Sequence, residues 1–211
     1  MASRPRSTPV SIIEAAEKLF SIYPIDSVSF RQIGIEAKVS NKSAINYHFK
    51  DRESLLQAIW DHRLPQLEGM RRRFLDEVAP QGEYSPKQIL AAIILPNYQI
   101  LDSTGRPTYG LFFRNALRWS SALNIRHNRL SQTPSSNEIL HLLIDAMPEI
   151  PKALLTARIR YAYCAFFDAV FERYEDIQNR QPVMPEKAFV EEGLDMAAAI
   201  CLRPPPSGLV R

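Results

Sequence analysis

A segment between residues 41 and 50 combines two apolar side chains with several polar ones. Ile45 and Phe49 lie one helical turn apart, so a helix through them would bury one face. Polar side chains then project from its first turn and its other side, namely Lys42, Ser43, Asn46 and Tyr47. Lysine binds guanine acceptors, asparagine pairs with adenine, and hydroxyl groups donate to phosphate oxygens. The segment therefore predicts a short helix that can read DNA.

Residues at both ends of this helix extend the predicted contact surface. Asn41 is expected to cap it, which leaves backbone N–H groups there for a phosphate. His48 and Lys50 add contacts to the DNA backbone. The residues expected to bind DNA are Ser29, Arg31, Asn41, Lys42, Ser43, Asn46, Tyr47, His48 and Lys50.

Two further helices are needed to hold such a helix in place. Thr8-Pro9 favours a helix start, and apolar residues recur at helical spacing after it. Ser29 is followed three residues later by Gln32, the spacing of a capping box, which predicts a second short helix. The interval from Lys38 to Ser40, in which two of the residues are polar, separates it from the third. This is a helix-turn-helix pattern, although a solvated helical hairpin gives the same spacing.

Residues 11–60 resemble the N-terminal domain of TetR-type transcriptional regulators. The resemblance rests on AAEKLF in the first helix, on SFRQI from Ser29, on Ala37 with Val39-Ser40, and above all on YHFKDRESLL from Tyr47. In this family such a run closes the recognition helix and opens the long helix to the second domain. The resemblance implies a helix-turn-helix domain over residues 8–64, an all-helical ligand-sensing and dimerisation domain over 65–203, and a flexible tail over 204–211.

Two positions depart from the family pattern. Lys38 stands where the family commonly has glycine, at a helix end in the left-handed conformation. A lysine there costs about 1 kcal/mol, and a turn about one residue longer than usual would relieve that strain. Gly34 stands where alanine is more common, and it allows close packing of helices at a cost in helix propensity.

The rest of the chain also has helical patterning. Asp51 is expected to cap a helix over residues 52–78, in which Pro65 should produce a kink or a break. After a linker at residues 80–86, helices are expected near residues 86–101, 109–124, 136–147, 151–177 and 185–202. The sequence has 7 glycines and 16 prolines, which disfavours a turn-rich sheet. We therefore expect an all-α chain of about nine helices.

Two roles of the second domain follow from the family resemblance. The last two helices are expected to pair with their copies in a homodimer, unless they only close the core of the monomer. The expected interface residues are Phe167, Val170, Tyr174, Phe189, Gly193, Leu194, Ala197 and Ile200. Aromatic residues with a few polar tips suit an apolar or aromatic small-molecule effector. The candidate pocket residues are Tyr98, Tyr109, Phe112, Phe113, Trp119, His141, Met147, Tyr163 and Phe166.

An enzyme is the main alternative. Glu138 and His141 have the ExxH spacing of di-iron bundles, but such sites need a second copy and the chain has none. A packed or pocket histidine is therefore favoured, and we expect no catalytic residues, no metal and no cofactor. Cys164 and Cys201 lie in apolar stretches without a metal-binding pattern, which indicates two reduced core residues.

Charge and hydropathy fit a DNA-binding protein. The net charge is +3, and the basic residues concentrate around the predicted helix-turn-helix, which favours a double-stranded DNA operator as partner. A protein-interaction module with a basic face remains an alternative. No apolar run is long enough to span a membrane, and the amino terminus lacks a secretory pattern. We therefore expect a cytoplasmic protein.

Overall fold

The computed structural model describes residues 8–39, 44–78, 82–119 and 134–206. Within these ranges the chain is all-helical, with nine α-helices, one short 3-10 helix and no strand. Contacts divide it into two compact units. Unit 1 comprises residues 1–66 and 101–129, and unit 2 comprises residues 67–100 and 130–211.

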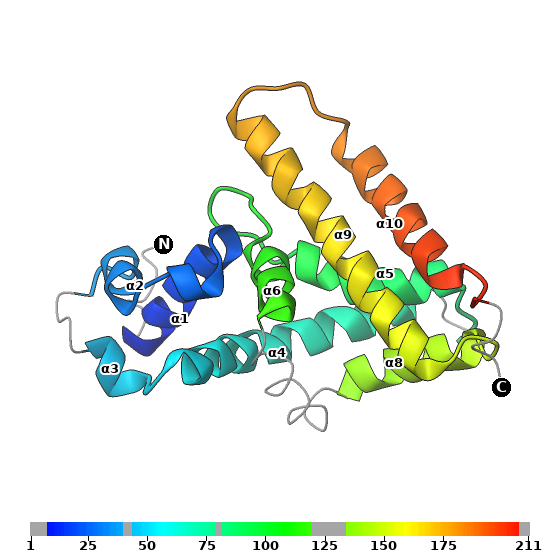
Figure 1. The fold of residues 1–211 in the computed structure, drawn as a ribbon, viewed down its shortest axis with the longest axis horizontal. Helices are drawn as coiled ribbons and strands as arrows, with labels where there is room; N and C mark the ends of the chain where they lie inside the picture. The colour runs from blue at the N-terminus through cyan, green and yellow to red at the C-terminus, as the bar shows by residue number, and fades with distance from the viewer. Residues whose placement is uncertain (1–7, 40–43, 79–81, 120–133, 207–211) are drawn as a thin grey trace. The chain divides into compact units, whose positions relative to one another are not determined.

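Unit 1 is built around its first helix. It contains α1 (Thr8–Ile22), the 3-10 helix η1 (Ile25–Ser27), α2 (Phe30–Glu36), α3 (Ala44–His48), the start of α4 (Arg52–Val78) and α6 (Thr108–Arg118). Ile12, Ala16 and Phe20 recur at helical spacing in α1 and are fully buried. The buried face of α1 packs against α6, α2 and α3 (Figure 1).

The side chains of Asn115 and Trp119 connect α6 to the end of α1 and to η1 by hydrogen bonds. The Asn115 side-chain amide donates to the carbonyl oxygens of Phe20 at 2.7 Å and of Tyr23 at 3.4 Å. These carbonyls belong to the last turn of α1 and the residue after it, where a helix lacks its own donors. The Trp119 indole N–H donates to Asp26 Oδ1 of η1 at 2.9 Å. These contacts fix the chain where it leaves α1 for α2.

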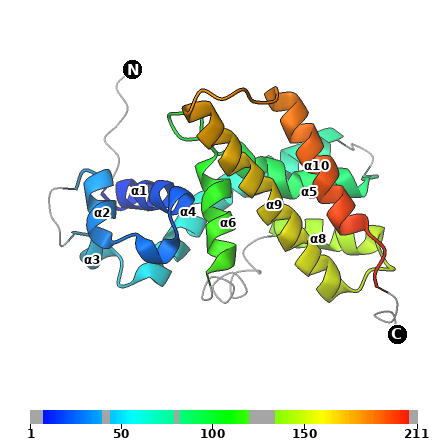
Figure 2. The same ribbon diagram turned by 45° about the horizontal axis from the view of Figure 1, so that its top comes forward.

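Unit 2 contains the end of α4, α5 (Pro86–Tyr98), α8 (Pro134–Ala146), α9 (Lys152–Gln178) and α10 (Glu186–Leu202). Helices α9 and α10 lie antiparallel and side by side (Figures 1 and 2), and α10 also packs against α5. Gly193 makes the close approach possible, because a Cβ there would lie 2.7 Å from two ring carbons of Phe166.

The end of α10 is held by a buried guanidinium. Arg158 donates to the carbonyl oxygens of Cys201, at 3.1 Å, and of Arg203. These carbonyls lie at the C-terminus of the helix, where a cation is favourable. Burial raises the pKa of the Cys201 thiol to about 11, and nearby Arg158 opposes this only in part. The thiol is therefore neutral at physiological pH.

The helix bounds lie within a few residues of those expected, except that α6 ends at Arg118 and not near residue 124. Of the two outcomes expected at Pro65, a kink or a break, the break does not occur, since α4 is continuous over 27 residues. Ile59 and Leu67, on either side of the proline, are both buried. The compact units divide α4 after residue 66, and residues 101–129, which contain α6, group with residues 1–66. The functional division into a DNA-binding and an effector domain stays a prediction.

Candidate nucleic-acid interface

Helix α2 begins with the predicted capping box. The Gln32 backbone N–H donates to Ser29 Oγ at 3.2 Å, and the Ser29 N–H donates to Gln32 Oε1 at 2.8 Å. Two backbone donors that the helix cannot satisfy are thereby paired. Ser29 and Arg31, at the start of α2, are both exposed.

Helix α2 ends in a left-handed residue that is not glycine. Lys38 has φ of 55°, which is the left-handed conformation expected at this position. The N–H groups of Lys38 and Val39 donate to the carbonyls of Ile35 and Gly34 at 3.1 and 3.0 Å. This is a Schellman motif, which pairs the last carbonyls of α2 and reverses the chain.

Helix α3 has one buried and one exposed side, as predicted. Ile45 and Phe49 are only 2% and 7% exposed, whereas Tyr47 is 85% exposed. Asn46, His48 and Lys50 are exposed as well. Helix α2 comes close to the buried side, since a Cβ at Gly34 would lie 3.4 Å from Ile45 Cδ1. The apolar side of α3 is therefore buried, and its polar side faces solvent. Asn41, Lys42 and Ser43 lie outside the described residues.

The start of α4 braces this arrangement. The Ser54 N–H donates to Asp51 Oδ1 at 2.8 Å, so Asp51 caps α4 as predicted. That N–H holds the pKa of the exposed Asp51 carboxyl below its ordinary value. The Arg52 guanidinium donates to the Val28 carbonyl at 2.6 Å, one residue before the α2 cap. This bond links the end of the helix-turn-helix to its beginning.

The candidate effector residues fall in both units. Tyr109, Phe112 and Phe113 belong to unit 1. Phe112 and Phe113 contact Trp60, and Tyr109 stacks on Phe113. The indole N–H of Trp119 donates to Asp26. Tyr98, Met147, Tyr163 and Phe166 are buried in unit 2. His141 was expected to be packed or in a pocket, but it is exposed on α8. Its apolar neighbours in sequence point to other sides of the helix.

Four of the expected dimer residues are buried within unit 2. They are Phe167, Val170, Leu194 and Ala197, at most 5% exposed. Tyr174, Phe189, Gly193 and Ile200 are half-buried. The apolar stripe on α9 and α10 is therefore partly buried within the single chain, and the pairing of these helices with a second copy stays a prediction. Large apolar side chains that are exposed on these helices include Tyr161, Met196 and Leu202.

The structure gives no support to a di-iron site. Glu138 pairs with Arg72 at 2.7 Å, which raises the pKa of that guanidinium, and His141 faces solvent. Across the described ranges, no three His, Cys, Asp or Glu residues are grouped so as to hold a metal ion.

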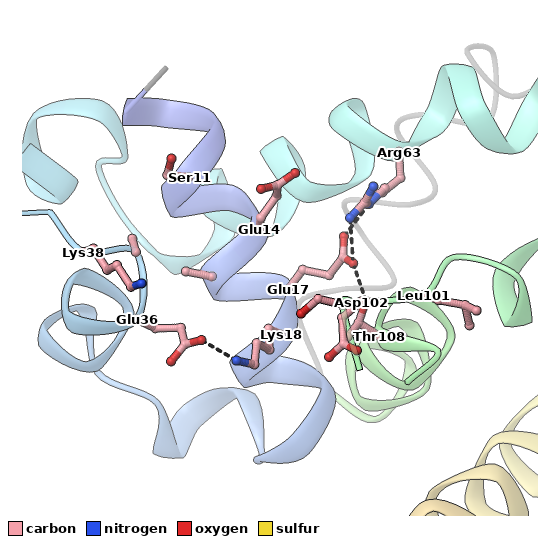
Figure 3. Close-up of a pocket in the computed structure, with 13 residues that line it drawn as sticks. Ser11, Glu14, Glu17, Lys18, Glu36, Lys38, Arg63, Leu101, Asp102 and Thr108 are labelled. Carbon is pink, nitrogen blue, oxygen red and sulfur yellow. Dashed lines mark hydrogen bonds and ion pairs between the residues drawn. The ribbon is translucent and has the colours of Figure 1, made fainter. Parts of the chain in front are cut away.

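A polar pocket in unit 1 was not expected from the sequence. It has a volume of about 420 Å³ and lies between α1, the end of α2, α4 and the segment before α6 (Figure 3). None of the nine effector candidates lines it. Its residues are Ser11, Glu14, Ala15, Glu17, Lys18, Glu36, Ala37, Lys38, Arg63, Leu101, Asp102, Ser103 and Thr108.

A buried carboxylate forms part of the wall of this pocket. Glu17, only 1% exposed, accepts two bonds from Arg63, at 2.7 and 3.1 Å, and one from Thr108 Oγ1 at 2.9 Å. A buried charge needs such partners to be stable. The three residues come from α1, α4 and α6, so this ion pair joins three helices of unit 1 (Figure 3).

Residues 12–59 match the model of a family described as bacterial regulatory proteins, tetR family. This part of the chain, which contains α2, α3 and the start of α4, belongs to that family. This part of the chain is therefore a DNA-binding module of the TetR type, and the exposed side of α2 and α3 is its candidate DNA interface.

Other comparisons add little to this assignment. Among solved structures, the chain is similar to a protein from Rhodococcus sp. assigned to the TetR-family transcriptional regulators, with 18% identity and a TM-score of 0.46. The match covers 92% of this chain and 100% of that one. No curated protein matches the chain. In the part of the chain that the structure describes, no helix is both long and apolar enough to cross a bilayer.

Proposed function

We propose that the protein is a dimeric transcriptional repressor of the cytoplasm, without enzymatic activity, that binds a near-palindromic operator. The observation that carries this proposal is the two-sided α3, with Ile45 and Phe49 buried while Asn46 and Tyr47 are exposed. Such a helix enters the major groove with its polar side toward the bases, and neighbouring residues contact phosphates. Ser29, Arg31, His48 and Lys50 are exposed and supply these contacts.

A homodimer would use the exposed side of α9 and α10 rather than the buried stripe. Tyr161, Ala165 and Ala169 form an exposed row on α9, with Met196, Ala199 and Leu202 on α10. Exposed apolar side chains that recur along a helix favour burial against another surface. A two-fold dimer would place two copies of α3 about 34–36 Å apart, which is one turn of DNA.

A small apolar or aromatic effector would release the operator. Aromatic side chains cluster in both units, around Trp60 in unit 1 and around Phe166 in unit 2. Release requires that the effector bind more tightly to a conformation with a different separation of the two α3 helices. This coupling is the regulatory part of the proposal.

Selection of bound sequences from a random DNA pool tests the function directly. We expect a two-fold symmetric site whose affinity falls steeply with salt, because phosphate contacts release counterions. Repeating the binding assay with a metabolite library would identify the effector. Absence of any enriched sequence, or binding that does not respond to salt, would contradict the proposal.

A further inference from the structure

The end of α6 is bonded to the connection between α1 and α2. Helices α6 and α1 pack against each other within unit 1 (Figures 1 and 2). Asn115, in the last turn of α6, and Trp119, directly after it, lie about one turn apart. Both lie outside residues 12–59, the part of the chain that matches the family model. Their polar groups bond to a segment that begins at Phe20 and ends at Asp26.

Asn115 supplies a donor that the end of α1 lacks. In a helix the Phe20 carbonyl would accept from the N–H of residue 24, but this residue is a proline and has no N–H. The Asn115 amide donates to this carbonyl at 2.7 Å and also to the Tyr23 carbonyl at 3.4 Å. Asn115 therefore fixes the direction in which the chain leaves α1.

Trp119 acts on the next part of the connection through a shared carboxylate oxygen. Its indole N–H donates to Asp26 Oδ1 at 2.9 Å, and the Arg52 guanidinium lies 3.5 Å from the same oxygen. The Asp26 side chain is 72% exposed, and an exposed ion pair is weak by itself. The indole bond therefore helps to hold the carboxylate beside Arg52.

Arg52 links this carboxylate to the start of α2. Its other terminal nitrogen donates to the Val28 carbonyl at 2.6 Å, and Val28 is a buried residue directly before the Ser29 cap. In the part of the chain that the structure describes, Arg52 Nε is buried without a hydrogen-bond partner. The terminal nitrogens therefore make the bonds that orient the guanidinium, one to Asp26 and one to Val28.

We propose that Asn115 and Trp119 are positioning residues for operator binding. They hold the connection between α1 and α2, so that the exposed sides of α2 and α3 keep one orientation. This inference rests on the proposed operator binding, and neither side chain is itself a DNA contact. A surface that is ordered before it meets its ligand loses less entropy on binding. Loss of the two side chains therefore weakens operator binding although every DNA contact remains.

Amide hydrogen exchange of the full chain without DNA tests the positioning itself. The double substitution Asn115→Ala, Trp119→Phe removes the amide and the indole N–H and keeps an aromatic ring. We expect the backbone amides of Gln32 and Ile33, in the first turn of α2, to exchange about tenfold faster. The amide of buried Ala16 in α1 should keep its wild-type rate, which shows that unit 1 as a whole is not destabilised.

Operator affinity tests the consequence for function. The double variant should bind the selected operator about tenfold more weakly, with an unchanged slope of log affinity against log salt concentration, because no phosphate contact is lost. The matched control Tyr23→Phe removes a hydroxyl group from an exposed side chain of the same connection and should bind as the wild type does. In an Asp26→Ala background, Trp119→Phe should have no further effect, because the two residues act through one bond.

Three results would overturn the inference. One is wild-type exchange of Gln32 and Ile33 in the double variant, and this result counts whether or not the protein binds DNA. The second is a smaller salt slope, which would make the end of α6 a DNA contact. The third is additivity of Asp26→Ala and Trp119→Phe. If the double variant does not fold, Trp119→Phe alone is measured in the same assays. A wild-type protein that binds no DNA would instead contradict the proposed function.

Discussion

Lys38 and Arg180 have the same backbone conformation, although they end different helices in different units. Each has φ of 55°, and each follows a helix whose last carbonyls accept from this residue and the next. Left-handed geometry brings a Cβ close to the following carbonyl, which glycine avoids. Both helices therefore end with a strained residue where glycine is usual.

Replacing either residue with glycine should stabilise the protein. For Lys38→Gly and Arg180→Gly we expect a gain of up to about 1 kcal/mol, reduced by the greater entropy of glycine in the unfolded chain. Denaturant unfolding measures the gain. Alanine variants at both positions keep the Cβ and serve as controls. If alanine stabilises as much as glycine, the effect comes from the lost charge and not from the backbone.

Alanine substitutions at two helical glycines should have different effects on the stability of the protein. Both substitutions gain about 1 kcal/mol of helix propensity, so their difference isolates packing. At Gly34 the new Cβ meets Ile45 Cδ1 at an ordinary 3.4 Å, and Gly34→Ala should be neutral or stabilising. At Gly193 it would lie 2.7 Å from the Phe166 ring, and Gly193→Ala should cost about 1–3 kcal/mol. Equal stability of the two variants would contradict the described packing of α10.

Substitutions on and after α3 should separate base recognition from phosphate contact. Asn46→Ala should change the preferred base at one operator position, at a cost of about 1–3 kcal/mol. Lys50→Ala should instead weaken binding to all DNA sequences by a similar factor. It should also reduce the slope of log affinity against log salt concentration by about one, which corresponds to one lost phosphate contact. Fluorescence anisotropy at several salt concentrations measures both effects. Exposed Lys187 on α10 provides the control, and Lys187→Ala should bind DNA as the wild type does.

A charge on the exposed side of α10 should prevent dimerisation. Met196 is 58% exposed in the single chain, so Met196→Glu should leave the monomer folded. In a dimer interface the carboxylate would be desolvated, and we expect at least about a tenfold increase in the dimer dissociation constant. Light scattering coupled to size-exclusion chromatography reports the mass. Arg73→Glu on α4 is the control, and a Met196→Glu variant that remains dimeric would exclude this side of α10.

Loss of the buried carboxylate of unit 1 should be costly. Glu17→Ala leaves the Arg63 guanidinium, whose side chain is 18% exposed, without its partner. We expect a loss of about 3 kcal/mol, against about 1 kcal/mol for Thr108→Val, which removes one hydrogen bond. Unfolding of both variants and of the double variant gives the coupling between the residues. A coupling energy near zero would mean that the Thr108 bond contributes nothing.

The features that the sequence predicted correctly depend on residues that lie close together in the chain. The start of α2 follows from Ser29 and Gln32, three residues apart, and the buried side of α3 follows from Ile45 and Phe49. The left-handed position of Lys38 was expected from the family pattern and is confirmed. The sequence left open whether Pro65 kinks or breaks its helix, and the structure shows that α4 is continuous.

Features that depend on distant residues could not be predicted. Glu17 is a charged residue in an amphipathic helix, and its burial depends on Thr108, 91 positions away. The apolar stripe through Phe167 and Val170 indicated a buried face, but not whether it packs on α10 or on another chain. Likewise, the apolar residues that flank His141 in the sequence gave no indication that the His141 side chain faces solvent.

The raised pKa of Cys201 has a practical consequence for labelling. A thiol that is neutral and enclosed reacts slowly with maleimides and iodoacetamide, because the thiolate is the nucleophile. Cys164 on α9 is only half-buried, so native protein offers a preferred attachment point for a fluorophore. A single dye there would lie on a helix of the proposed dimer, where energy transfer between two labelled copies could follow assembly without any engineered cysteine.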